Sequence, residues 1–191
     1  MTTATGTQQI TGTYTLDPAH TRIGFVARHA MVTKVRGSFN EFEGTATIDG
    51  DNPARSSARV TIQAASIDTR NADRDAHLRS NDFVAMDEFP QITFVSSGVT
   101  VVDETTFELS GDLTIKGVTH PVELDVEYLG TGGDPWGGTR AGFEASTVIS
   151  RKEWGIDFNI PLDGGKLMIG DKITVQLNVE VVLQPQEALA V

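Results

Sequence analysis

The feature that most constrains this chain is a regular alternation of apolar and polar residues along most of its length. From Thr106 to Lys116, small or apolar residues occupy every second position, and polar residues occupy the positions between them. After Lys116-Gly117, a pair typical of a tight turn, the alternation resumes over 122–128, and it returns over 173–183. Because successive side chains of a strand point to opposite faces, such segments form strands with one dry face and one wet face.

The number and length of these segments indicate how the sheet closes. Further strands are predicted at 22–29, 35–49, 56–67, 91–102 and 140–150. The apolar phase slips between Phe39 and Phe42, where one extra residue near Asn40 and Glu41 would form a β-bulge. About eight antiparallel strands with one dry face each form a sandwich or a barrel, and glycines within long strands favour the curved sheet of a barrel. The predicted fold is therefore all-β, an eight-stranded antiparallel barrel.

One stretch, 69–94, departs from the strand pattern. Asn71 is placed to cap a short helix over 72–80, and a helix of this length is marginal in water on its own. It must therefore be held by docking of the large apolar side chains of the insert, which are Leu78, Phe83, Met86 and Phe89. We expect this one short helical insert to cover a barrel mouth and to control ligand access.

Composition excludes several classes of function. The formal net charge is −11 and no run of Lys and Arg occurs, which argues against nucleic acid and disfavours docking on an anionic membrane. The absence of cysteine excludes disulfides and thiolate metal sites. No stretch approaches 18 apolar residues, so the chain is not expected to span a membrane. The first residues resemble no signal peptide, so the expected location is cytoplasmic.

Five pieces of the chain carry a resemblance to a known family. In order, they are YTLDPAHTRIGFVARH, VRGSFNEFEGTATID, IDTRNADRDAHLRSNDFVAMDEFPQITF, LSGDLTIKGVTHPVELDV and TVISRKEWGI. The ordered set resembles the YceI-like family, lipocalin-like proteins that bind polyisoprenoids. The resemblance implies a lipocalin-like barrel whose long apolar pore holds an isoprenoid or another long-chain amphiphile. We therefore expect a flexible tail at 1–12, a single YceI-like β-barrel domain at 13–184 and a second tail at 185–191.

The candidate lipid-binding residues are apolar side chains expected to face the interior. They are Ile23, Phe25, Phe39, Phe42, Phe94, Phe107, Leu109, Leu113, Leu124, Val126, Tyr128, Phe143, Ile149, Leu177 and Val179. Periodicity alone does not decide whether they fill a core or line a pore, and the resemblance favours the pore. Burying an isoprene unit contributes roughly 4 kcal/mol, whereas micromolar affinity needs about 8 kcal/mol. A polyprenyl or quinone-like chain can therefore bind without an ionic group or a cofactor.

A second set is expected at a rim or lid. It comprises His29, Leu78, Phe83, Met86, Phe89 and Trp154. His29 continues the apolar face of Ile23 and Phe25, so it is either a hydrogen-bonded rim residue or a contact to a ligand head group. A turn near Trp154, with Arg151, is expected to seal one barrel end through ring stacking and a buried salt bridge.

Catalytic and metal chemistry find little support in the motifs. The four histidines lie far apart, with no spacing typical of a metal site, so neither a metal nor a cofactor is expected. In the insert, Arg74, Asp75, His77, Arg79 and Asp82 are either acid–base groups or structural ties, and Asp75 with Arg79 has the spacing of a helical ion pair. No nucleophile motif accompanies them, so no catalytic residue is assigned.

Three functions remain open at this point. The favoured one is carriage or sequestration of a long-chain isoprenoid-type lipid, with no enzymatic activity. The alternatives are an enzyme that acts on an isoprenoid bound in the pore, and a filled barrel with a stress or interaction role. The oligomeric state is open, and a homodimer is one candidate.

Overall fold

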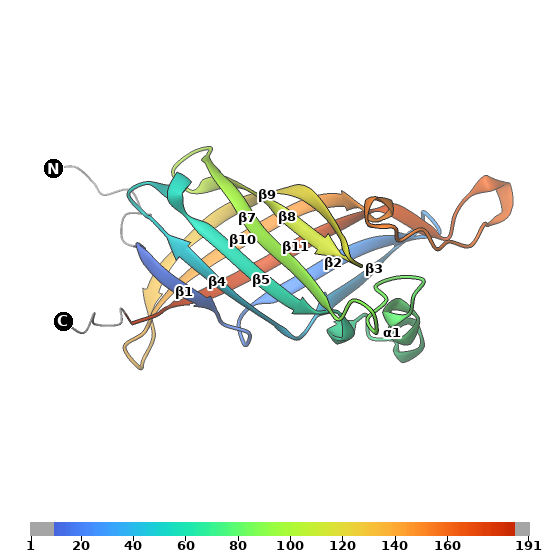
Figure 1. The fold of residues 1–191 in the computed structure, drawn as a ribbon, viewed down its shortest axis with the longest axis horizontal. Coiled ribbons are helices and arrows are strands. Elements are labelled where there is room, and N and C mark those ends of the chain that lie inside the picture. The colour runs from blue at the N-terminus through green and yellow to red at the C-terminus, as the bar shows by residue number, and fades with distance from the viewer. Residues whose placement is uncertain (1–9, 186–191) are drawn as a thin grey trace.

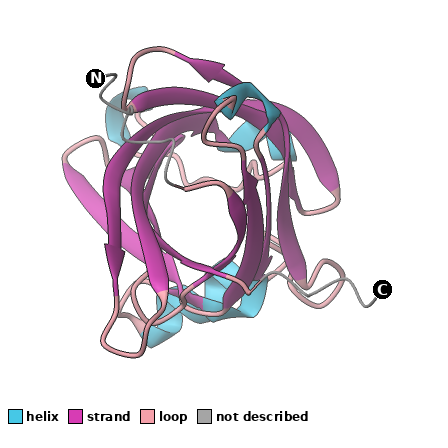
Figure 2. Ribbon diagram, turned by 90° about the vertical axis from the view of Figure 1, so that its left-hand side faces the viewer, coloured by secondary structure: helices cyan, strands magenta, loops and turns pink. Residues whose placement is uncertain are grey.

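A closed ring of antiparallel strands forms the body of the protein (Figures 1 and 2). The computed structural model describes residues 10–185. Its strands are β1 (Gly12–Leu16), β2 (Arg22–His29), β3 (Thr33–Phe39), β4 (Phe42–Ile48), β5 (Ser57–Gln63), β6 (Ile67–Asp68), β7 (Gln91–Val101), β8 (Thr106–Ile115), β9 (Val118–Gly133), β10 (Thr139–Ser150) and β11 (Ile169–Leu183). The helices are α1 (Ala72–Arg79) and four short 3₁₀ segments, η1 (Pro53–Arg55), η2 (Ala64–Ser66), η3 (Arg151–Trp154) and η4 (Asp163–Gly165).

These segments build eight long strands, as the alternation predicts. Three of the eight are each built from two consecutive labelled strands: β1 with β2, β3 with β4, and β5 with β6. The pairing of β1 with β11 closes the ring and sets Tyr14 opposite Leu183. The prediction of a closed eight-stranded antiparallel barrel with one short helical insert is therefore confirmed.

Two local irregularities set which side chains face inward. The predicted phase slip between Phe39 and Phe42 is present: the strand breaks between them, and both rings pack against the same interior cluster. A second shift lies in β7 between Ser96 and Gly98, and it turns Val99 toward the interior. Such bulges change the facing of a strand beyond them, so alternation alone misplaces the residues that follow.

The predicted tight turn joins β8 to β9. Lys116 and Gly117 have φ values of 50° and 73°, which lie in the left-handed region that two-residue hairpins require. A Cβ added at Gly117 would meet the Phe89 ring at 2.5 Å, so the insert packs directly on this turn. Glycine at 117 therefore serves both the turn and the docking of the insert.

The interior contains two packed clusters. The terminal cluster consists of the buried side chains Ile10, Tyr14, Phe107, Tyr128, Ala141 and Val181. The insert cluster consists of the buried side chains Ile23, Ile62, Ala64, Val84 and Ile92. The terminal cluster therefore includes Ile10, a residue of the segment 1–12 that the sequence analysis expects to be a flexible tail. Residues 1–9 and 186–191, which make up most of the two expected tails, lie outside the described residues.

Candidate functional site

An apolar cavity of about 270 Å³ lies inside the barrel, and its wall includes members of both clusters. Alternate residues of β8, β9, β10 and β11 supply a large part of the wall, because the inner faces of these strands carry branched and aromatic side chains. The wall extends to the loop between β4 and β5, where it includes Asp49, Gly50 and Pro53. The cavity therefore reaches the end of the barrel that carries the chain termini.

The expected lipid-binding residues divide into two groups. Ten of them line the cavity: Ile23, Phe94, Phe107, Leu109, Leu113, Leu124, Val126, Phe143, Leu177 and Val179. The other five do not: Phe25, Phe39, Phe42, Tyr128 and Ile149. The structure brings the first group together around one space. The role of either group in ligand binding is a proposal.

The five residues outside the wall are engaged in packing or lie beyond the cavity. Phe25 and Phe39 have ring centroids 5.8 Å apart, and Phe42 packs against the insert cluster. Tyr128 belongs to the terminal cluster, with its ring centroid 5.4 Å from that of Phe143. Ile149 is half-buried near the end of β10. A side chain must therefore face inward to line the cavity, but its position along the barrel axis decides whether it reaches the cavity or packs elsewhere.

Several wall residues escaped the sequence reasoning. Leu16 lies on β1, a strand of only five residues in which the apolar alternation is limited to Tyr14 and Leu16. Val99 escaped because its facing depends on the bulge that ends at Gly98, although an isolated glycine inside a strand is a known signal for such a bulge. Ile10 escaped because no strand pattern surrounds it.

The rim and lid set lies away from the cavity. None of His29, Leu78, Phe83, Met86, Phe89 and Trp154 is part of its wall. His29 is exposed at the end of β2. Met86 packs against the insert cluster, and the Phe83 ring packs against those of His77 and Phe158, with centroid distances of 5.0 and 5.4 Å. The insert therefore packs against the barrel interior as expected, and its control of ligand access stays a prediction.

Polar side chains bond the insert to the barrel, and these bonds replace the ion pair expected between Asp75 and Arg79. Arg79 donates to the carbonyl oxygens of Ala65 and Ile67 at 2.7 and 2.9 Å. The buried Asp75 carboxylate accepts from the backbone N–H and the hydroxyl of Thr69, at 2.9 and 2.5 Å. Asp75 and Arg79 therefore form no ion pair, because each has closer partners in the chain just before the helix.

The remaining polar groups of the insert are structural ties as well. Asn71 accepts from the N–H of Arg74 at 2.9 Å, so the predicted helix cap is confirmed. The Arg74 guanidinium donates to Thr69, at 2.7 Å to its hydroxyl and 2.9 Å to its carbonyl. His77 and Asp82 lie 2.8 Å apart at the surface, outside the cavity wall. This pair therefore does not face the space in which a ligand would lie.

The contacts in the turn around Trp154 also differ from the salt bridge that the sequence predicts there. Trp154 is fully buried and donates its indole N–H to the carbonyl of Leu113 at 3.0 Å. The Arg151 guanidinium donates to the carbonyls of Ile156 and Phe158 at 2.7 and 3.0 Å. Burial lowers the pKa of Arg151. Backbone carbonyls, which attract a cation without being charged, take the place of the expected carboxylate.

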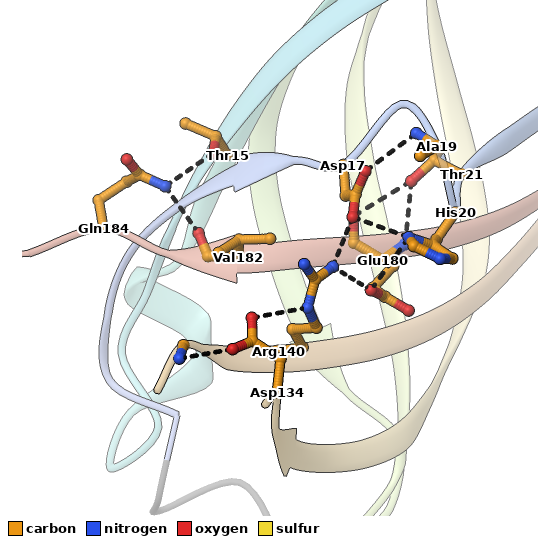
Figure 3. Close-up of polar contacts among 11 residues, drawn as sticks. Thr15, Asp17, Ala19, His20, Thr21, Asp134, Arg140, Glu180, Val182 and Gln184 are labelled. Atoms are coloured by element: carbon orange, nitrogen blue, oxygen red, sulfur yellow. Dashed lines mark hydrogen bonds and ion pairs between the residues drawn. The ribbon is translucent and has the colours of Figure 1, made fainter. Parts of the chain in front are cut away.

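A cluster of charged residues joins the strands near the barrel's terminal end (Figure 3). The Arg140 guanidinium bonds to the carboxylates of Asp17, Glu180 and Asp134, the last at 3.1 Å. Hydrogen bonds from His20 and then Arg140 lower the pKa of Asp17 to about 2. Bonds to the same three carboxylates, Asp17 foremost, hold the pKa of Arg140 above its usual value.

Three of these residues resemble a cation site but do not fit one. Potential ligand atoms of Asp17, His20 and Glu180 lie within 4.8 Å of one another. The positive Arg140 guanidinium already contacts both carboxylates, so a metal cation would meet charge repulsion and would have to displace it. The cluster is therefore a network of ion pairs that holds β1, β10 and β11 together.

No helix within residues 10–185 is long and apolar enough to cross a membrane. Comparison with known proteins shows similarity over most of the chain. Residues 14–181 match the model of the YceI-like domain. Over 146 residues the chain is 45% identical to Protein YceI of Shigella flexneri. The matched region covers 76% of this chain and 74% of that protein.

Two solved structures show the same fold at lower identity. BcnA of Burkholderia cenocepacia superposes with a TM-score of 0.76 at 23% identity, over 86% of this chain and 98% of BcnA. A polyisoprenoid binding domain from Saccharophagus degradans superposes with a TM-score of 0.63 at 15% identity, over 90% and 98% of the two chains.

Proposed function

Because the chain belongs to the YceI-like family, we propose that it carries or sequesters a long-chain apolar ligand of the polyisoprenoid class. The cavity in the barrel holds the ligand. The observation that carries this proposal is the cavity wall, where aliphatic and aromatic side chains from at least seven strands enclose one apolar space. A domain with this fold from Saccharophagus degradans is described as polyisoprenoid-binding, which supports the ligand class.

The size and chemistry of the cavity suit part of an apolar chain. Its volume of about 270 Å³ lies just below the roughly 300–1,000 Å³ of small-molecule pockets. Each buried CH₂ contributes about 0.8 kcal/mol, so a few isoprene units supply the free energy of micromolar binding even after ordering costs. Shape and chain length therefore govern selectivity more than the head group does.

The polar groups on the wall favour binding over chemistry. Asp49 is the carboxylate of the wall, and it is engaged in its own loop: it accepts from the N–H of Asn52 at 2.9 Å and lies 3.9 Å from Arg55. The other polar wall residues are hydroxyl side chains such as Thr21, Thr45 and Thr147. An acid–base pair, which an isomerase or hydrolase needs, does not face the cavity in the described part of the chain.

Organic extraction of the natively purified protein, followed by mass spectrometry, tests the proposal. We expect a stoichiometric long-chain lipid, or uptake of a polyprenyl probe by protein stripped of lipid. The proposal fails if extracts contain no lipid and neither a polyprenyl nor a quinone probe quenches Trp fluorescence or raises the melting temperature.

Matched substitutions locate the ligand. Leu109→Arg or Val126→Arg places a charge in the apolar wall, whereas Glu108→Arg or Asp125→Arg changes the outer face of the same strands. We expect loss of probe binding only in the first pair. Equal loss in both pairs of folded variants would place the ligand elsewhere.

A milder pair covers the case in which a buried arginine prevents folding. Ala145→Phe adds a ring inside the cavity, and Ser146→Phe adds the same ring on the exposed face of β10. We expect the first to exclude the probe while leaving the far-UV circular dichroism spectrum unchanged, and the second to bind as the parent protein does. Normal probe binding by Ala145→Phe would contradict the proposed site.

A further inference from the structure

A basic groove of about 430 Å³ lies on the outer face of the barrel, where β11, β2 and β3 run side by side. Four exposed basic side chains line it: Arg28, Lys34, Arg36 and Lys172. The acidic residue of its wall, Asp171, accepts from the Ser150 hydroxyl at 2.8 Å. The groove is therefore positive although the chain as a whole carries a net charge of −11.

The basic residues of the groove are not explained by partners in the fold. Within residues 10–185, none of the four takes part in an ion pair. Arg28 and Lys34 are direct cross-strand partners, and like charges in that position destabilise a sheet. A chain with 26 acidic residues available thus places two cations opposite each other, which suggests a partner outside the chain.

Exposed apolar side chains stand at the tip of the same hairpin. Met31 and Val32, in the turn between β2 and β3, are 56% and 78% exposed. Ala30 and Met31 have φ values of 49° and 60°, a left-handed conformation that is strained for residues other than glycine. The strained turn holds the Met31 and Val32 side chains in water, where they have no role in the core.

A neighbouring loop extends this apolar tip. The N–H of Ala30 donates to the carbonyl of Met168 at 2.6 Å, which ties the hairpin to the loop that precedes β11. Leu167 of that loop is 42% exposed. Figure 1 shows the loop projecting from the barrel at the end where β2 and β3 meet. The two tips thus form one apolar edge beside the basic groove.

We propose that the basic groove and the Met31–Val32 tip form a docking surface for a bilayer of anionic phospholipids. Basic side chains meet the head groups while apolar side chains enter the interfacial region, an arrangement that peripheral membrane proteins share. A free phosphate ion would need only the groove and would leave the exposed apolar tip unexplained. The bilayer is the occupant that accounts for both features.

The net negative charge of the protein does not prevent this docking. Screening limits electrostatic interactions to about 8 Å at physiological ionic strength, so acidic residues on distant faces contribute little at the membrane. Each basic residue near an anionic surface strengthens binding by about fivefold. The local charge of the groove therefore outweighs the distant charge, which the composition alone does not reveal. The proposal does not depend on what the barrel cavity holds.

Co-sedimentation with sucrose-loaded vesicles tests the proposal. Phosphatidylcholine vesicles with and without phosphatidylglycerol are compared at low and high salt. We expect binding that needs phosphatidylglycerol and weakens with salt. The double variant Lys34→Glu/Arg36→Glu should bind at least about 25-fold more weakly, and Arg22→Glu/Arg59→Glu, at exposed sites outside the groove, should bind as the parent does.

Two further measurements complete the design. Met31→Ser should weaken vesicle binding while the salt dependence persists. Lys34→Glu alone should keep or raise the melting temperature, because it replaces a like-charge pair with Arg28 by an attractive one.

Three results would overturn the proposal. They are no binding that depends on phosphatidylglycerol, equal loss in both double variants, and full competition by inorganic phosphate with no effect of Met31→Ser. The last would assign the groove to a free anion.

Discussion

The two ends of the barrel interior are closed in different ways. At one end the insert packs Val84 and Met86 into the interior, and arginine and aspartate side chains bond it to backbone atoms near Thr69 and Ile67. At the other end Ile10 covers the cavity, and within residues 10–185 the segment before β1 is held by a side-chain bond from the Gly50 N–H to the Thr11 hydroxyl at 3.0 Å.

This difference indicates where a ligand enters. Opening the insert end breaks several bonds to buried groups, each of which costs free energy when left unmade. Among the residues that the structure describes, opening the terminal end displaces the Ile10 side chain and breaks the bond between Gly50 and Thr11. We therefore propose that ligands pass the terminal end, between Ile10 and the loop from β4 to β5, and that the insert is a fixed closure.

The largest expected effect concerns the fixed closure. Asp75→Ala removes the acceptor of both the N–H and the hydroxyl of Thr69 and leaves buried donors without a partner. We expect a loss of about 2–4 kcal/mol in the free energy of unfolding, measured by urea titration. Asp75→Asn, which keeps an acceptor oxygen, is the control and should lose less. Equal losses would mean that packing, rather than these bonds, holds the insert.

The next prediction separates the two ends kinetically. Ile10→Ala shortens the side chain that covers the cavity, so a bound polyprenyl probe should dissociate about tenfold faster, equivalent to 1.4 kcal/mol. Phe83→Ala should loosen the insert, visible as faster hydrogen exchange over 70–90, with little change in release. The reverse result, faster release from Phe83→Ala alone, would make the insert the lid expected from the sequence.

The two ends should also differ in their response to acid. The pKa of Asp17 is about 2 in the fold against an ordinary value of 3.8. Its contribution to stability is therefore complete above about pH 4 and is lost as the pH falls toward 2. Hydrogen exchange should show the Asp17–Arg140 region loosening in this window, whereas the hydrogen bonds from Arg79 to the carbonyls of Ala65 and Ile67 persist, because these carbonyls accept no proton in this range.

Asp17→Asn provides the control for the acid experiment. It removes the ionisable group, so the variant should be less stable at neutral pH and should lose less on acidification to pH 2. An unchanged acid profile of thermal unfolding in the variant would assign the pH dependence to other carboxylates.

The smallest expected effect lies inside the terminal cluster. Tyr14 is fully buried, and its hydroxyl has no protein partner among residues 10–185. Tyr14→Phe should therefore raise the free energy of unfolding by about 1 kcal/mol at neutral pH. Burial, with Tyr128 nearby, raises the pKa of Tyr14. The hydroxyl therefore ionises in the unfolded chain at a lower pH than in the fold. The free energy of unfolding of the parent protein falls as the pH rises above about 10, and the variant should be less sensitive to alkali. Destabilisation by Tyr14→Phe would reveal a hydroxyl contact.

Particular elements show which structural features a local sequence pattern predicts. The strand alternation, the turn at Lys116-Gly117 and the cap at Asn71 follow from residue chemistry within a few positions, and all three are confirmed. The expected ion pair of Asp75 with Arg79 was wrong, because groups of the segment just before the helix bond to the same side chains. Val99 was missed, because one bulge inverts the facing of all that follows.

Most of the inward-facing positions, the place where the strand pattern stops and the acidity of the chain all follow from the amino-acid sequence alone. Tertiary structure decided which inward residues line the cavity and which fill the clusters, since a period of two sets the face of a side chain but not its depth. Depth follows from register between distant strands, as in the pairing of Tyr14 with Leu183. The same registers bring Arg28, Lys34 and Lys172 to one groove. Charge at a surface depends on which strands become neighbours, and only the closed barrel makes them so.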